Sequence, residues 1–152
     1  MQVIYARQSL ADLTGPVLFL AGPTPRSAET PSWRPAALQE LAETLNFTGT
    51  VLVPEDQSHT PYIDYDHQIE WEWEGLDAAD AIVFWVPREL ATMPAFTTNI
   101  EFGMYWNSGK VVLGFPPEAP KMRYLERLAG RGQIPVEATL SATLAAALAK
   151  VG

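Results

Sequence analysis

Short apolar runs alternate with amphipathic segments along most of this chain. The runs of strand length are Val17–Ala21, Thr50–Val53, Ala81–Val86 and Val111–Phe115. Strands that are buried on both faces, as in parallel sheets, have continuous apolar runs of this kind instead of alternating polar positions. Weaker patterns predict further short strands at residues 3–6 and 134–136, and Pro135 in the latter is tolerated at a sheet edge.

Apolar residues recur at helical spacing between these runs. They predict a helix after Ser32 and another near residues 66–79, and further helices are predicted at residues 122–129 and 140–151. In the second helix we expect Asp66, Ile69, Trp73 and Leu76 to face inward. The alternation of strands and helices predicts an α/β fold, a flavodoxin- or Rossmann-like three-layer sandwich, with a mostly parallel central sheet of about five strands.

Composition narrows the classes of function. The 152 residues fit a single domain spanning residues 1–152, and a hydrophobic fraction of 47% supports a globular chain. The net charge of −8 disfavours a nucleic-acid or anionic-membrane partner. The chain has no cysteine, no apolar run near the ~20 residues of a membrane span, and no evident signal peptide, so we expect a cytoplasmic protein.

Three loops should meet at the carboxyl edge of the predicted sheet: Gly22–Arg26, Pro54–Asp66 and Pro87–Glu101. The first combines Gly22, the Thr24 hydroxyl and the Arg26 cation, a set that can hold a phosphate or a sugar. An ordinary strand-to-helix turn is the alternative. The G-x-G-x-x-G and G-x-x-x-x-G-K-[ST] patterns are missing, so we expect no dinucleotide cofactor.

The segment after the second loop is rich in acids. Glu70 and Glu74 share one helix face at a spacing of four residues and form a solvated acidic face in the simplest interpretation, while Glu72 lies on a different side. His59 and His67 flank the same segment, but their spacing matches no metal-ligand pattern, and we expect no metal. A serine hydrolase is unsupported because no G-x-S-x-G motif occurs.

The stretch Thr97–Gly103 lies between the strand predicted at Ala81–Val86 and the one at Val111–Phe115. We expect Glu101 in the opening turn of a short helix beside a pocket, where a carboxylate can act as a nucleophile or a base. The helix dipole alone would also favour an acid in a first turn.

Three segments together carry a family resemblance. They are Phe19–Pro23 at the end of the first buried strand, Leu76–Val83 at the start of the third, and Asn99–Gly103 followed by Ser108–Leu113. In this order and spacing, over about residues 17–115, the chain resembles the nucleoside 2-deoxyribosyltransferase superfamily.

The resemblance implies a flavodoxin-like fold and cleavage of the N-glycosidic bond of a nucleoside or nucleoside 5′-monophosphate. It makes Glu101 the nucleophile, which would form a glycosyl ester, and Glu72 the acid that assists the leaving base. Glu72 lies eight residues before Asp80, where the family often has an aspartate. The predicted substrate-binding residues are Gly22, Pro23, Thr24, Arg26, Asp66, Asn99 and Gly103.

Two questions stay open from the sequence. The loop before Glu101 has Thr97, Thr98 and Asn99 where transferases of the family often have an aspartate, so both hydrolysis and transfer remain candidates. The alternatives to an enzyme are a nucleotide- or nucleotide-sugar-binding module without turnover, and a partner-binding domain. We also expect a homodimer or larger homo-oligomer, because Trp71, Trp73, Tyr105 and Trp106 are more aromatic surface than a small monomer easily hides.

Overall fold

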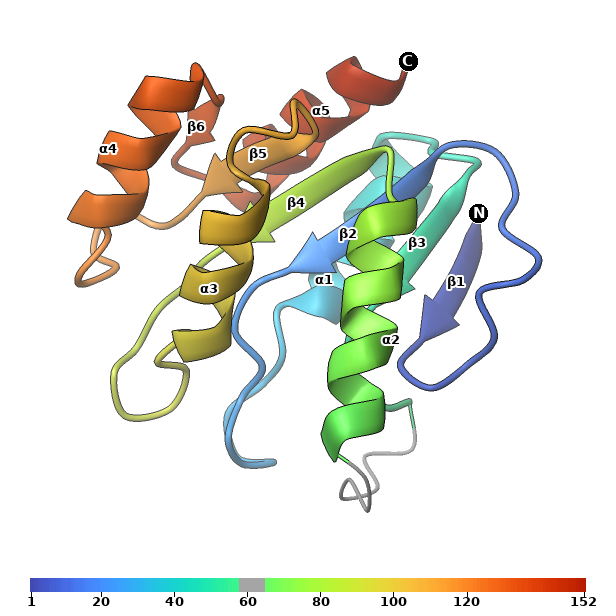
Figure 1. Ribbon diagram of the computed structural model, residues 1–152, viewed down its shortest axis with the longest axis horizontal. Coiled ribbons are helices and arrows are strands. Elements are labelled where there is room, and N and C mark those ends of the chain that lie inside the picture. Colours follow the sequence, from blue (N-terminus) through green and yellow to red (C-terminus); the bar gives the residue numbers. More distant parts are fainter. Residues whose placement is uncertain (58–64) are drawn as a thin grey trace.

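The computed structural model describes residues 1–57 and 65–152, and within them six strands form one sheet (Figure 1). The strands are β1 (Gln2–Tyr5), β2 (Val17–Ala21), β3 (Thr50–Val53), β4 (Ala81–Trp85), β5 (Val111–Gly114) and β6 (Val136–Glu137). They are ordered β1-β3-β2-β4-β5-β6, and every neighbouring pair is parallel. The predicted α/β class of flavodoxin- or Rossmann-like type is confirmed. His59 lies outside the described residues.

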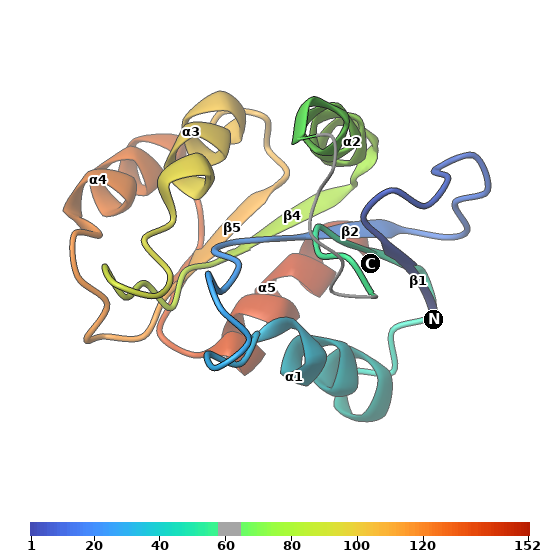
Figure 2. The ribbon, with the colours of Figure 1, turned by 90° about the horizontal axis from the view of Figure 1, so that it is seen from below.

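Helices cover both faces of the sheet (Figure 2). One face carries α2 (Tyr65–Ala78), α3 (Phe96–Tyr105) and α4 (Arg123–Gly132), and the other carries α5 (Leu140–Val151) and α1 (Arg34–Gln39), which continues into the π-helical turn η1 (Glu40–Thr44). Among the described residues, no helix has the length and apolar character that crossing a membrane requires.

The central strands are apolar throughout because both of their faces are buried. Phe19 and Ile82 belong to the core beneath α2, α3 and α4, whereas their neighbours Leu18 and Val83 belong to the core beneath α1 and α5. Burying a side chain of this size stabilises the fold by about 1.5–3 kcal/mol. Two cores thus hold the sheet rigid between its helical layers.

Helix α3 begins earlier than predicted. It starts at Phe96, after Ala95 in a left-handed conformation with φ of 61°, so Thr97–Asn99 are helical. Glu101 is therefore the sixth residue of α3, and the expectation that it lies in the opening turn is wrong. Threonine and asparagine are weak helix formers, which made the segment resemble a loop. Burial of Thr98 and Phe102 on one face stabilises the helix instead.

Helix α2 turns a different face to the core from the one predicted. Its buried residues are Gln68, Trp71, Gly75 and Leu76. Asp66 is exposed and Trp73 is 49% exposed, so their predicted inward orientation is wrong. Close packing at Gly75 provides the reason, since a Cβ at that position would lie only 2.9 Å from the Phe19 ring.

The predicted aromatic surface patch is mostly hidden. Trp71 is buried, with its ring centroid 6.2 Å from that of Phe19, while Tyr105 and Trp106 are half-buried. Only Trp73 of this group is exposed. The aromatic residues therefore do not supply the oligomer surface that their number suggested.

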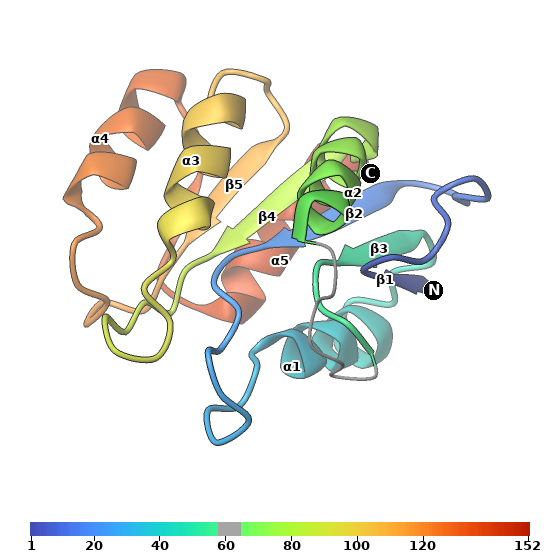
Figure 3. The ribbon, with the colours of Figure 1, turned by 60° about the horizontal axis from the view of Figure 1, so that its bottom comes forward.

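The order of the strands reverses direction between β2 and β4. From β2 the chain continues to β3 on one side and then crosses to β4 on the other. The carboxyl ends of parallel strands at such a reversal form a crevice in which α/β proteins bind ligands. Figure 3 shows the loops that follow β2 and β4 leaving this edge of the sheet, next to α2 and α3.

Candidate active site

The crevice starts at Gly22, the residue that follows β2. Gly22 has φ of 143°, and a Cβ at this position would lie 2.1 Å from the Trp85 carbonyl oxygen at the end of β4. Only glycine accommodates both the positive φ and the close backbone approach. The loop after β2 is therefore pressed against the end of β4 at the point where the strand order reverses.

Arg34, at the start of α1, holds this loop from beneath. Its side chain is fully buried and donates hydrogen bonds to the carbonyl oxygens of Leu20 (3.0 Å) and Gly22 (2.7 Å) and to Thr24 Oγ1 (3.1 Å). It also pairs with the Glu55 carboxylate after β3, at 2.5 Å. Arg34 was not among the predicted site residues, because nothing in the local pattern distinguishes a buried arginine from an exposed one at a helix start.

Glu101 on α3 and Glu72 on α2 come together above this edge. Burial raises the pKa of Glu101 to about 8, with a further contribution from the negative charge of Glu72, against the opposing effect of Arg34. Burial also raises the pKa of Glu72, although a hydrogen bond from Gln68 and the charge of Arg34 oppose the increase. The two acids are therefore close enough to disfavour double ionisation, and they titrate as a pair.

Gln68 is a second site residue that was not predicted from the sequence. It lies one turn before Glu72 on α2 and is buried, and its Nε2 donates to Glu72 Oε1 at 2.5 Å. Its own Oε1 is buried without a hydrogen-bond partner among the described residues. The spacing of four residues from an acid is the signal that would have selected it.

Tyr105 lies one turn after Glu101 on α3. Its hydroxyl donates to Asp77 Oδ1 at 2.5 Å, and the Asp77 backbone oxygen accepts from Lys110 Nζ at 2.8 Å. Burial raises the pKa of Tyr105 to about 12, with contributions from the Asp77 hydrogen bond and the charges of Asp77 and Glu101. Tyr105 therefore stays a neutral hydroxyl over the physiological range.

The remaining predicted residues of the Gly22–Arg26 loop lie at the same edge. Pro23 is buried, and its carbonyl accepts from Trp33 Nε1 at 3.1 Å. The Arg26 side chain is exposed, its guanidinium lies 5.6 Å from the centre of the Phe96 ring, and its backbone N–H donates to the Thr92 carbonyl at 3.1 Å. Arg26 is thus a solvent-accessible cation beside the N-terminal end of α3.

Three predicted substrate-binding residues are placed elsewhere. Asn99 and Gly103 line a groove between α3 and α4, on the side of α3 away from α2, and Asn99 Oδ1 accepts from Arg88. Asp66 is on the outward face of α2. These residues are not gathered around Glu101.

This arrangement suits proton transfer and covalent attack at one carbon. One acid of a coupled pair can hold the proton while the other is ionised, which supplies a nucleophile and a proton donor at the same time. Among the described residues, no group of three histidines, cysteines or acids is placed to hold a metal ion.

Comparison with known protein families gives a match over most of the chain. Residues 15–119 match the family model described as nucleoside 2-deoxyribosyltransferase like. The matched region contains Gly22, Arg34, Glu72 and Glu101 and covers more than half of the 152 residues. No curated protein matches the chain.

Proposed function

Since the chain belongs to the nucleoside 2-deoxyribosyltransferase-like family, we propose that it cleaves the N-glycosidic bond of a nucleoside or a nucleoside 5′-monophosphate. Glu101 is the nucleophile and Glu72 is the proton donor. The observation that carries the proposal is the coupled pair of carboxyl groups, both with raised pKa values, above the carboxyl ends of β2 and β4. Arg34 maintains the loop against which the sugar lies.

The first step breaks the bond between C1′ and the base nitrogen. A Glu101 carboxylate oxygen attacks C1′ and forms an ester, the bonding electron pair leaves with the base nitrogen, and Glu72 transfers its proton to the base. The transition state has oxocarbenium character, so the negative charge of Glu101 is stabilised by the positive charge that develops at C1′. Substrate therefore favours the ionised form of Glu101 that burial disfavours in the free protein.

The second step resolves the ester. Either water or a second base attacks C1′, Glu72 accepts a proton from the attacking group, and Glu101 is released as a carboxylate. The reactive state requires one proton on the pair, located on Glu72. We therefore expect a bell-shaped dependence of kcat/KM on pH, with activity lost when both acids are protonated and when both are ionised.

A 5′-phosphate fits the exposed end of the crevice. Arg26, the Thr24 hydroxyl and the loop N–H groups are the groups available to it, because the Arg34 guanidinium already has four acceptors. We expect a nucleoside 5′-monophosphate to have a lower KM than the same nucleoside.

The test incubates the protein with a panel of nucleosides and their 5′-monophosphates and measures the released free base by chromatography. We expect Glu101→Gln and Glu101→Ala to lower the rate at least about 10⁴-fold, the size of effect seen when a catalytic nucleophile is removed. The control is Glu74→Gln, which changes an exposed acid on α2 and should retain wild-type activity. Mass spectrometry of acid-quenched protein should locate a glycosyl adduct on the peptide that contains Glu101.

Two results would decide against this mechanism. Wild-type base release that survives both Glu101 variants would exclude Glu101 as the nucleophile. Saturable binding in calorimetry without base release would favour a binding module without turnover.

Addition of a second base to the reaction distinguishes transfer, which yields a new nucleoside, from hydrolysis, which yields the free sugar or sugar phosphate.

A further inference from the structure

Arg88, in the loop between β4 and α3, is a second buried arginine of this protein and is only 4% exposed. Its Nη1 donates to the Lys121 backbone oxygen at 2.8 Å, and its Nη2 donates to Asn99 Oδ1. Its Nε is buried and has no hydrogen-bond partner in the described part of the chain. Within that part, the hydrogen bonds of the Arg88 guanidinium therefore go to neutral oxygens, and one of its donors is unused.

The charge of Arg88 forms no ion pair with a carboxylate of the described residues, whereas that of Arg34 pairs with Glu55. The acid next to Arg88 in the sequence, Glu89, accepts from the Thr92 hydroxyl at 2.7 Å instead. Burial lowers the pKa of Arg88, as expected for a cation that its surroundings stabilise poorly. A buried charge is costly unless a charge of opposite sign accompanies it. Arg88 is therefore prepared for an anion from outside the chain.

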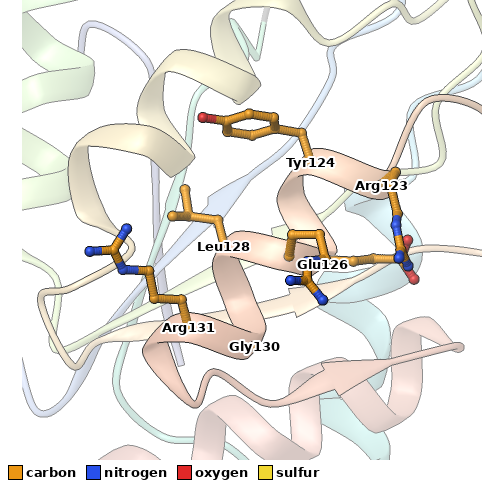
Figure 4. Close-up of a pocket in the computed structure, with 7 residues that line it drawn as sticks. Arg123, Tyr124, Glu126, Leu128, Gly130 and Arg131 are labelled. Atoms are coloured by element: carbon orange, nitrogen blue, oxygen red, sulfur yellow. The ribbon is translucent and has the colours of Figure 1, made fainter.

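The two residues that accept hydrogen bonds from Arg88, Asn99 and Lys121, both line the groove between α3 and α4, which has a volume of about 340 Å³. Figure 4 shows Tyr124 and Leu128 extending from α4 toward α3. The remaining walls are mostly apolar and are formed by Ile100, Phe102, Gly103, Tyr124, Leu125 and Leu128. A groove of this size with apolar walls and a few polar groups is typical of a site for a small organic molecule. Its polar end, at Arg88 and Lys121, is cationic.

Asn99 provides the route by which a ligand reaches Arg88. Its side chain is exposed, so water satisfies the amide when it turns away from the guanidinium. A carboxylate or phosphate oxygen in the position of Asn99 Oδ1 would accept from Arg88 Nη2, and a charge-assisted hydrogen bond is roughly twice as strong as one to a neutral oxygen. The exchange supplies the negative charge that Arg88 lacks, and the apolar part of the ligand lies against the walls of the groove.

We propose that the groove between α3 and α4 binds a small organic oxyanion, a carboxylate or a phosphate monoester, whose charged group replaces the Asn99 amide on Arg88. This site is separate from the proposed substrate crevice, which lies on the α2 side of α3 and has Arg26 as its exposed cation (Figure 2). The proposal is independent of the reaction at Glu101. A ligand in the groove would nevertheless contact α3, the helix that carries Glu101.

The test measures the binding of benzoate, phenyl phosphate and inorganic phosphate by calorimetry at constant ionic strength. The parent protein is Arg26→Met, because this substitution removes the exposed arginine that is proposed to bind a 5′-phosphate in the crevice. We expect at least one of the two organic anions to bind with a Kd about 10-fold or more below that of inorganic phosphate, since its ring is buried in the groove. The organic anion that binds identifies the charged group, carboxylate or phosphate, that the site accepts.

Two substitutions of Asn99 in this parent give opposite results if the proposal is correct. Asn99→Asp places a carboxylate on Arg88 from within the chain, so it should abolish binding of the organic anions and raise Tm by about 2–4 °C. Asn99→Ala empties the same position without adding charge, and it should bind with a Kd equal to or below that of the parent. Arg88→Met should lose binding, and circular dichroism should show that every variant remains folded.

The matched control is Asn107→Asp, which makes the same change at an exposed asparagine after α3 and should leave the Kd unchanged. Absence of binding by both organic anions at millimolar concentration overturns the proposal. Equal binding by Asn99→Asp and Asn107→Asp also overturns it, because the ligand would then not use Arg88. Loss of binding in Asn99→Ala would show that the Asn99 amide is a ligand contact, which contradicts its replacement by the ligand.

Discussion

Two charged sites at the same edge of the sheet differ in how far the protein satisfies them. The Arg34 guanidinium is fully buried, and it donates to two backbone carbonyls, the Thr24 hydroxyl and the Glu55 carboxylate. Within the described part of the chain, the Glu72 carboxyl group accepts one hydrogen bond, from Gln68, and no hydrogen bond to the Glu101 carboxyl group is seen. Burial consequently raises the pKa values of both acids.

This difference distinguishes a residue that stabilises the structure, Arg34, from the two acids proposed to carry out the reaction. A buried charge with a complete set of partners is stable in one geometry, and its removal leaves those partners unsatisfied. A buried carboxyl without partners is destabilised when it ionises, and a cationic transition state relieves that cost. We therefore expect substitution of Arg34 to affect mainly stability, and substitution of the two acids to affect mainly catalysis.

The largest of these effects is expected for Glu72→Gln, and it is an effect on kcat/KM. Loss of the proton donor should lower kcat/KM about 10²- to 10⁴-fold, the usual range for a general acid. The loss should be smaller for a nucleoside whose base is a better leaving group. Removal of the Glu72 charge also lowers the pKa of Glu101, so the acidic limb of the pH–rate profile should move to lower pH. An unchanged acidic limb would contradict the coupling.

The next effect is on stability. Arg34→Met should reduce the free energy of unfolding by about 3–5 kcal/mol, because Glu55 and two backbone carbonyls lose a buried partner. Urea unfolding followed by circular dichroism measures the change. Arg26→Met is the matched control, because Arg26 is an exposed arginine of the loop that Arg34 holds, and it should change the free energy of unfolding by less than about 0.5 kcal/mol. Equal effects of the two variants would mean that Arg34 is not the support of this loop.

Glu101→Gln is expected to raise the free energy of unfolding, an effect smaller than that of Arg34→Met and opposite in sign. The folded pKa of about 8 is above the ordinary value of 4.5, so ionisation favours the unfolded chain as the pH rises from 4.5 to 8. Glutamine removes this cost, and at pH 9 we expect a gain of about 1–2 kcal/mol, or about 3–6 °C in Tm. At pH 4 the two proteins should melt at the same temperature. A variant less stable than the wild type at pH 9 would exclude the destabilised carboxylate.

The smallest effect is expected for Gln68→Met, which keeps the volume of the side chain and removes its hydrogen bond. The bond from Gln68 lowers the pKa of Glu72, so its loss should raise that pKa and move the basic limb of the pH–rate profile to higher pH. We expect kcat at the optimum to change less than about 5-fold. The control Gln39→Met removes an exposed amide on α1 and should leave the profile in place.

Much of the architecture could be predicted from local pattern. Three features follow from neighbours in the chain: the four buried strands β2 to β5, the outward position of Glu70 and Glu74, and the cap of α5 by Thr139. The Thr139 Oγ1 accepts from the Ala142 N–H at 3.2 Å. The start of α3 could not be predicted in this way. Its Thr-Thr-Asn segment has low helix propensity, and the burial of Thr98 and Phe102 outweighs that preference.

Some residues of the candidate site could likewise be predicted from the sequence, and others could be found only in the tertiary structure. The sequence by itself determined the family, the fold class and the two candidate acids, because short motifs in fixed order around apolar strands are properties of the chain alone. Only the tertiary structure decided that the Arg34 charge and the Gln68 amide lie near those acids, and that Asn99 and Gly103 line the groove between α3 and α4. The physical reason is that burial and charge coupling depend on which elements pack together. The orientation of α2, set by packing at Gly75, and of α3, set by burial of Phe102, decides which of their side chains are buried near one another.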